Sequence, residues 1–172
     1  MSGRVTSYHA RFFMITEVKM KSRKPVQSAK QSAVRYLSRR DHAEQELRQK
    51  LLARGYGQAE ADEALAFCQD YNWLDDARFA ERLRSNGIAK GWGPLRIRQE
   101  MAFKGIHDAI VRQQFADDEF DWYQHARQVA VRKYGDSPME TAKEKARRLR
   151  FMQSRGFDLE QIKYALDVDD EY

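Results

Sequence analysis

The residues that most often carry catalysis or bind metals do not gather into such a pattern in this sequence. The four histidines lie in different segments: His9, His42, His107 and His125. No two of them stand at the spacing of metal ligands, and no pair of cysteines could complete a zinc site. The single cysteine, Cys68, lies beside Phe67 in a helical pattern, which predicts a buried and unreactive thiol. We therefore expect no metal, no disulfide and no cofactor.

Two other patterns could indicate catalysis. The adjacent carboxylates Asp75 and Asp76 could form an acid and base pair, but they stand directly before a helical pattern. At that position a carboxylate accepts hydrogen bonds from free backbone N–H groups, and we prefer this capping role. The glycine-rich run from Lys90 to Gly93 lacks both the preceding strand and the GK[ST] ending of a nucleotide-binding loop. The sequence therefore indicates a protein that is not an enzyme.

Basic residues form the strongest chemical pattern of the chain. The 31 lysines and arginines exceed the 26 acidic residues, which gives a net charge of +5. Residues 78–114 and 122–166 each carry an excess of five positive charges, and a short acidic run follows each block. Basic blocks separated by acidic runs can present a positive face without a large overall charge. This distribution predicts an anionic partner.

Two groups of residues are the candidates for binding that partner. The central group is Arg78, Arg82, Lys90, Trp92, Arg96, Arg98 and Lys104, and the second group, on one predicted helix, is Lys143, Lys145, Arg147, Arg148 and Arg150. Unpaired arginines on one helix repel each other unless an anion offsets them, so a binding surface and a solvated face are both open interpretations. Trp92 is interpreted either as an exposed aromatic ring for stacking or as a ring folded onto the junction between two units.

Helices must position these residues. The chain has three prolines and nine glycines, it is rich in good helix formers, and no alternating apolar pattern indicates a strand. We therefore predict an all-α protein. The longest apolar run, from Phe12 to Ile15, is far too short to span a membrane, and no secretory signal is recognisable. We expect a cytoplasmic protein without membrane contact.

An internal repeat organises the predicted helices. Three glycines stand 50 and 51 residues apart, each after a basic and before an apolar residue: Gly55, Gly105 and Gly156. Four residues before them stand Leu51, Met101 and Met152, and ten residues after them stand Leu65, Phe115 and Leu166. A period near 50 with one helix–Gly–helix turn indicates stacked modules that complete each other's cores. The prediction is three tandem three-helix repeats in an elongated, curved array.

The predicted boundaries follow from charge, apolar pattern and helix caps. We expect a basic arm over 1–25, repeats over 26–74, 75–120 and 121–167, and an acidic tail over 168–172. The arm is interpreted as a solvated tail, a nucleic-acid-binding arm or a leader before a natural start at Met20, and we favour the last. Predicted helix starts are a capping box of Asp41 with Glu44, the pair Gly93-Pro94, and the run from Ser137 to Glu140.

The central stretch resembles a known family. The segments WLDDARFAERL, GWGPLRIRQEM and KGI lie in order between Trp73 and Ile106 and are similar to the signature of the RecX family, regulators of the RecA recombinase. The resemblance continues with fewer matches over RYLSRRDHAEQELRQKLLARG and over the last third, and it does not cover residues 1–25.

The resemblance implies a non-enzymatic, monomeric regulator. It would bind RecA filaments on single-stranded DNA and inhibit recombinase, ATPase and coprotease activity, within homologous recombination, DNA repair and the SOS response. The residues alone support a second hypothesis, a helical module that binds DNA directly through its basic faces. Weaker binding of double-stranded DNA stays open, as does the choice between capping filament ends and blocking the filament groove.

Overall fold

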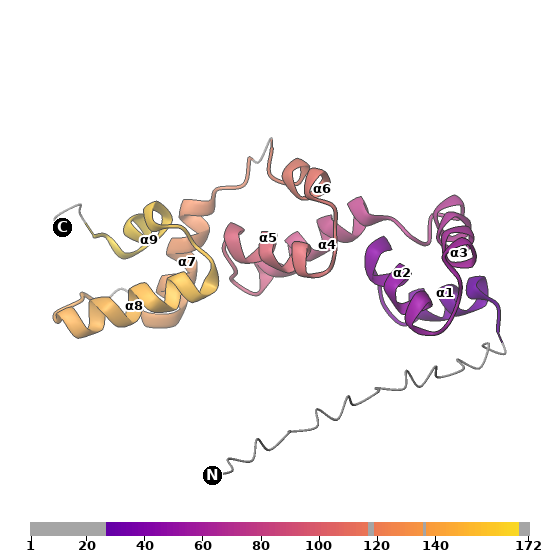
Figure 1. The fold of residues 1–172 in the computed structure, drawn as a ribbon. Helices are drawn as coiled ribbons and strands as arrows, with labels where there is room; N and C mark the ends of the chain where they lie inside the picture. The colour runs from indigo at the N-terminus through magenta and orange to yellow at the C-terminus, as the bar shows by residue number, and fades with distance from the viewer. Residues whose placement is uncertain (1–26, 117–118, 136, 169–172) are drawn as a thin grey trace, which may run out of the picture.

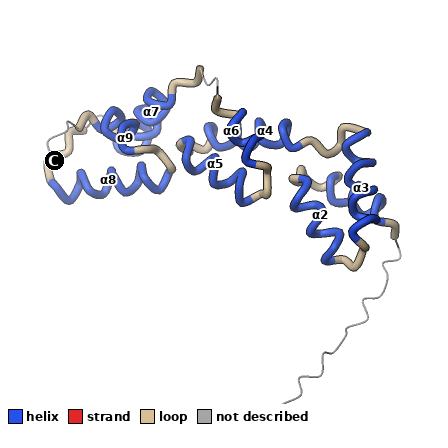
Figure 2. The backbone as a smooth tube through the Cα atoms, turned by 45° about the horizontal axis from the view of Figure 1, so that its top comes forward, coloured by secondary structure: helices blue, strands red, loops and turns tan. Residues whose placement is uncertain are grey.

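The computed structural model describes residues 27–116, 119–135 and 137–168, and within them it contains helices and no strand. The helices form three successive units in a row (Figures 1 and 2). Their bounds are α1 Ala29–Leu37, α2 Glu44–Ala53 and α3 Gln58–Asp70; α4 Asp76–Ala89, α5 Pro94–Phe103 and α6 Asp108–Gln113; α7 Trp122–Tyr134, α8 Ala142–Arg155 and α9 Leu159–Leu166. This confirms the all-α array of three three-helix repeats. The predicted N-terminal arm and most of the acidic tail lie outside the described residues.

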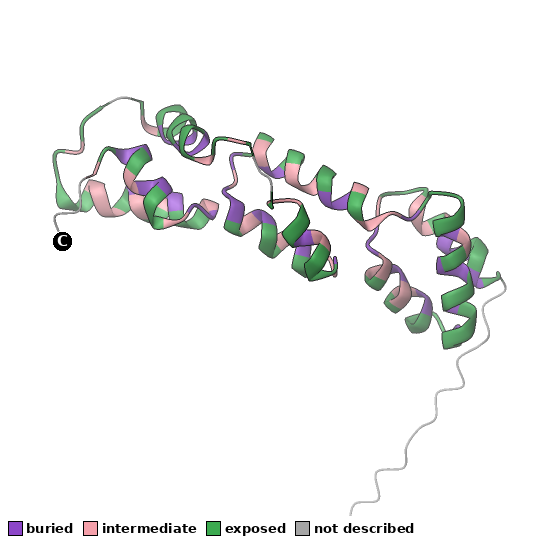
Figure 3. Ribbon diagram, turned by 90° about the horizontal axis from the view of Figure 1, so that it is seen from above, coloured by how far each residue is buried: buried purple, intermediate pink, exposed green. Residues whose placement is uncertain are grey.

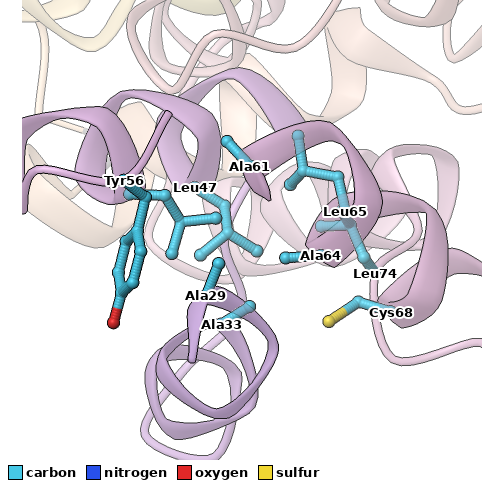
Figure 4. Close-up of a cluster of buried hydrophobic side chains, with 10 residues drawn as sticks. Ala29, Ala33, Leu47, Tyr56, Ala61, Ala64, Leu65, Cys68 and Leu74 are labelled. Carbon is cyan, nitrogen blue, oxygen red and sulfur yellow. The ribbon is translucent and has the colours of Figure 1, made fainter. Parts of the chain in front are cut away.

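Each unit has its own small apolar core. In the first unit, Leu47 and Leu51 from α2 pack on Ala61 and Leu65 from α3, and the buried Cys68 lies in the same cluster (Figure 4). Buried residues of the other units likewise line the faces where their helices meet (Figure 3). Small cores of this kind stabilise one module only weakly, so the contacts between modules are needed for the array.

The repeated glycines end the second helix of each unit in the same way. Gly55, Gly105 and Gly156 all have left-handed backbones, with φ of 94°, 81° and 84°. The next residue's N–H donates to the carbonyl five residues earlier: Tyr56 to Leu51, Ile106 to Met101 and Phe157 to Met152. These six side chains are all buried. The sequence repeat is therefore a repeated Schellman helix stop, in which the apolar residue on each side of the glycine closes the core.

The second helices of the units, α2, α5 and α8, meet end to end along the row (Figure 1). A Cβ placed on Gly105 would lie 3.2 Å from Cβ of Gln45 in the first turn of α2, and one on Gly156 would meet Arg96 in the first turn of α5. Each later helix thus places its C-terminal end on the N-terminal end of the earlier one. The carbonyl end of the α5 dipole thereby faces the N–H end of α2, and the carbonyl end of α8 faces the N–H end of α5.

These junctions replace local helix caps. Neither α2 nor α5 receives a hydrogen bond from a side chain at its own N-cap. At α5 the N–H groups of Gly93 and Leu95 instead donate to the carbonyls of Arg155 and Gly156, at 2.8 and 3.1 Å. The free donors of a helix start are therefore satisfied by the following unit. In contrast, α8 is capped locally by Thr141, whose hydroxyl accepts from the Glu144 N–H.

At the junction between the first two units, the predicted capping box of Asp41 with Glu44 does not form. Ala43 precedes α2 and is fully buried in the core of the second unit. The Glu44 N–H donates to Oδ1 of Asp76, at 2.8 Å, while Asp41 forms an ion pair with Arg82. The prediction was wrong because the acceptor comes from a residue 32 positions away.

The other predicted helix starts had mixed outcomes. Asp75 caps α4 by accepting from the Arg78 N–H, and Gly93 and Pro94 occupy the N-cap and first position of α5, as expected. The start predicted between Ser137 and Glu140 was wrong, because α8 begins at Ala142. Among the described residues, no helix combines the length and the apolar character needed to cross a membrane.

Candidate nucleic-acid interface

The basic residues of the first unit are mostly neutralised by neighbouring carboxylates. Arg40 pairs with Glu46, and Lys50 lies 3.6 Å from the same carboxylate. Arg48 binds both Glu44 and Asp62. Most of the basic residues of this unit are therefore paired, while the exposed Arg35 and Arg39 lie outside these ion pairs.

The central candidates do not form one surface. Arg78 donates to the carbonyl of Asn72, Arg82 pairs with Asp41 of the first unit, and Lys104 lies 3.6 Å from Glu100. Arg98 is exposed, with its guanidinium 4.4 Å from the centre of the Phe115 ring. Arg82 therefore helps to join two units, and Arg78, Arg98 and Lys104 stand apart from Trp92.

Trp92 lies half-buried at the junction of the second and third units. Its carbonyl accepts from His125 Nε2 of α7, at 3.2 Å, and the flanking Gly91 and Gly93 are both buried. The amino group of Lys90 and the guanidinium of Arg96 lie 4.9 and 4.5 Å from the centre of its rings. The ring packs on the core of the second unit, with its Cε3 3.4 Å from the position of a Cβ added to Gly87, so Trp92 is not a freely exposed ring.

More cations continue from this junction along the third unit. Arg155, in the last turn of α8, donates to the carbonyl of Lys90, at 3.1 Å, and lies over the ring of Phe151. Arg132 of α7 lies against Gly91, where its Nη2 would be 2.8 Å from an added Cβ. The cations therefore surround the point where α8 meets α5.

Two further cations, Lys133 of α7 and Arg147 of α8, extend this surface. Lys133 lies 6.0 Å from the centre of the Phe151 ring, and Arg147 lies 5.5 Å from that of Tyr134. The rings of Tyr134 and Phe151 meet edge to face, with their centres 5.5 Å apart. Contacts within about 6 Å of a ring centre are in the range of cation–π attraction.

We call these six cations the basic stripe: Lys90, Arg96, Arg132, Lys133, Arg147 and Arg155. Within the described part of the chain, the only ion pair of the stripe joins Arg147 to Glu144, at 3.6 Å, and the Arg147 side chain is 63% exposed. An exposed pair of this kind holds a cation only weakly. The stripe is therefore a continuous positive surface across two units, suited to a polyanion.

Arg148 stands apart from the other candidates on α8. It is buried, it donates to Glu144 at 2.7 Å and to the Ser137 carbonyl at 2.9 Å, and it therefore supports the loop before α8. We leave it out of the binding surface for that reason. Lys143 and Arg150 are exposed and Lys145 is half-buried.

The sequence-based candidates omitted Arg155 of α8 and two residues of α7, Arg132 and Lys133. Both occupy the last turn of α7, where a cation is favoured by the helix dipole and needs no further explanation. Only the packing of α7 against Gly91 and Phe151 brings them to the other cations. These contacts join α7 to other parts of the chain, so the distances along the sequence do not predict them.

The buried His125 makes the junction sensitive to pH. Burial lowers the pKa of His125 below its ordinary 6.5, the bond to the Trp92 carbonyl opposes this, and the nearby Arg132 lowers it further. The unfolded chain therefore takes up this proton first as the pH falls. The contribution of the neutral His125 to the free energy of unfolding is fully present above about pH 6.5, and it is lost as the pH falls toward the pKa of His125 in the folded protein. His42, whose pKa burial also lowers, acts in the same direction.

We expect urea unfolding to show less stability at pH 5.5 than at pH 7.5, with a slope of up to about 1.4 kcal/mol per pH unit for each histidine. His125→Gln should reduce the loss and leave the share of His42. Burial raises the pKa of Asp76, which acts in the opposite sense, but this contribution is common to both proteins and cancels in the comparison. An unchanged loss in His125→Gln would contradict the assignment.

Comparison with known proteins identifies the three units. Models of the RecX first, second and third three-helix domains match residues 29–68, 75–113 and 119–166. The Regulatory protein RecX of Vibrio vulnificus is 42% identical over 142 residues, 83% of this chain and 93% of that protein. The same-named protein of Cronobacter sakazakii is 45% identical over 140 residues, 76% of this chain and 85% of the relative.

Solved structures of RecX proteins have a similar fold. The crystal structure of RecX from Lactobacillus salivarius superposes with a TM-score of 0.68 at 18% identity, covering 82% of this chain and 94% of that one. A second crystal structure, of a regulatory protein RecX, superposes with a TM-score of 0.64 at 20% identity and covers 81% and 70%. At these identities the superpositions show a shared fold.

Proposed function

The chain belongs to the RecX family of regulatory proteins, and from this premise we propose that it regulates the RecA recombinase without being an enzyme. It binds RecA filaments on single-stranded DNA in the cytoplasm, as a monomer, and limits strand exchange, ATP hydrolysis and coprotease activity. The observation that carries the proposal is the basic stripe, a positive surface crossing two units with one weak internal ion pair in the described residues. A filament offers both phosphates and protein, which an elongated array can contact together.

A second function is favoured by the same surface. Cations without carboxylate partners bind nucleic acid with no other protein present, so the chain could be a module that binds DNA directly. The two functions differ in one requirement, because only the first needs the recombinase. Affinity that comes from phosphates alone falls steeply with salt, whereas contact with a protein surface is less affected.

The test compares retention of the full chain on bare single-stranded DNA and on RecA-coated DNA, in about 150 mM salt, where counterion-release binding is already weak. We expect retention on the coated strand at salt concentrations that remove the protein from the bare strand. Titration should also lower ATP hydrolysis by RecA on that DNA. Equal retention on both strands, with unchanged hydrolysis, would favour direct DNA binding instead.

A further inference from the structure

The aromatic rings within the basic stripe are covered by the chain's own cations. Trp92 has Lys90 and Arg96 within 4.9 Å of its ring centre. Phe151 has Arg155 at 5.0 Å and Lys133 at 6.0 Å, and Tyr134 has Arg147 at 5.5 Å and the buried Arg148 at 5.0 Å. Every ring of the stripe is therefore in contact with two cations.

The same rings are also partly buried. Trp92, Tyr134 and Phe151 are all half-buried; Trp92 packs on the core of the second unit and Phe151 on that of the third. The large aromatic side chains that are exposed, such as Tyr71, Trp73 and Phe103, lie outside the stripe. A surface that stacks bases needs a free ring face. In the stripe, each half-buried ring already has two of the chain's own cations within 6.0 Å of its centre, which leaves less ring surface for a base.

We infer that the basic stripe recognises the phosphodiester backbone alone and makes no use of the bases. The inference rests on the proposed function and specifies the chemical group that the stripe binds. Trp92, Tyr134 and Phe151 act as positioning residues that hold long cationic side chains in place before the ligand arrives. A cation already held over a ring loses less conformational freedom on binding a phosphate, which strengthens the contact.

The helix geometry suits successive phosphates. Arg147 and Arg155 are eight residues apart on α8, a rise of about 12 Å. The end-to-end contact of α8 with α5 then brings Arg155 to the Lys90 carbonyl and places Arg96 beyond it, with its Nη1 donating to the carbonyl of Ser154 at 2.9 Å. Backbone hydrogen bonds hold this junction, so the cations on its two sides keep a fixed separation.

The test measures binding of the full chain to two bare strands with the same number of phosphates, at about 50 mM salt. One is oligo-thymidine and the other is an abasic strand of deoxyribose phosphates. We expect dissociation constants within about twofold of each other and equal slopes of log K against log salt. Stacking is worth about 1 to 3 kcal/mol per base, so even one stacked base would weaken abasic binding about fivefold or more.

Weaker binding of the abasic strand by fivefold or more would overturn the inference and leave the proposed function standing. Failure of both strands to bind would overturn the stripe as a nucleic-acid surface, and with it the DNA contact of the proposed function. These two outcomes are distinguishable because the first retains affinity for oligo-thymidine.

The positioning role has its own variants. Phe151→Leu keeps an apolar side chain but removes the ring, and should weaken binding of both strands equally, by about two- to fivefold, with unchanged circular dichroism; Phe151→Tyr should restore it. Phe103→Leu is the matched control, because Phe103 is also contacted by a lysine, Lys104, but lies outside the stripe. Unchanged affinity in Phe151→Leu, or a loss on oligo-thymidine only, would overturn the positioning role.

Discussion

Gly93→Ala is expected to separate the third unit from the second and to be among the most destabilising single substitutions in the chain. A Cβ added to Gly93 would lie 2.4 Å from the carbonyl oxygen of Gly156 and 2.6 Å from the backbone nitrogen of Phe157, both just after α8. These are backbone atoms, which cannot move aside as a flexible side chain would. The two backbone hydrogen bonds from Gly93 and Leu95 would be lost with the contact. We expect a cost of about 3 kcal/mol or more, from overpacking and two lost bonds together.

Gly57→Ala is the matched control. Gly57 and Gly93 occupy the same local position, the N-cap of a helix, with similar extended backbones. A Cβ on Gly57 would meet only Oε2 of Glu60, at 3.5 Å, which is ordinary contact. It should therefore cost only about 1 kcal/mol, the usual loss for alanine at an N-cap.

Urea and thermal unfolding followed by circular dichroism measure both variants. Gly93→Ala should lower the midpoint far more than Gly57→Ala and should broaden the transition, because the third unit then unfolds by itself. Equal effects of the two substitutions would show that the end-to-end contact of α8 with α5 does not stabilise the array.

Removing charge from the basic stripe is expected to flatten the salt dependence of DNA binding. Lys133, Arg147 and Arg155 come from two helices; Lys133 and Arg147 are exposed, and the hydrogen bond of the half-buried Arg155 to the Lys90 carbonyl also lies at the surface. If each neutralises one phosphate, their joint replacement by Gln should reduce the slope of log K against log salt by about 2 on a single strand. Affinity at about 50 mM salt should fall by one to two orders of magnitude, at about 1 kcal/mol or less per lost contact.

A control with the same change in net charge uses Arg35, Arg39 and Arg112, replaced together by Gln. All three are exposed and lie outside the stripe. Their loss should leave the slope within experimental error, since long-range attraction is screened within about 10 Å at 0.1 M salt. If both triple variants changed the slope equally, total charge would explain binding and the stripe would have no special role.

Much of the fold could be predicted because its rules are local. The left-handed glycine after each second helix, Pro94 in the first turn of α5 and Asp75 before α4 act through neighbours within five residues. The glycine pattern, repeated about every 50 residues, then predicted three three-helix units. Conformational preferences and hydrogen bonds of this range are encoded in spacing, so the sequence by itself contains them.

Only the tertiary structure decided how the units join and which cations gather. Asp76 of the second unit accepts the hydrogen bond at the start of α2, and Ala43 of the first unit is buried in the core of the second. The residue types alone do not indicate either contact. Arg148 turns inward to Glu144 and Ser137, whereas Arg132 reaches Gly91 from another unit. A free helix N–H accepts any suitably placed oxygen, and a long cation can point into the protein or out of it. Distances between units choose among these possibilities, and spacing along the chain does not specify those distances.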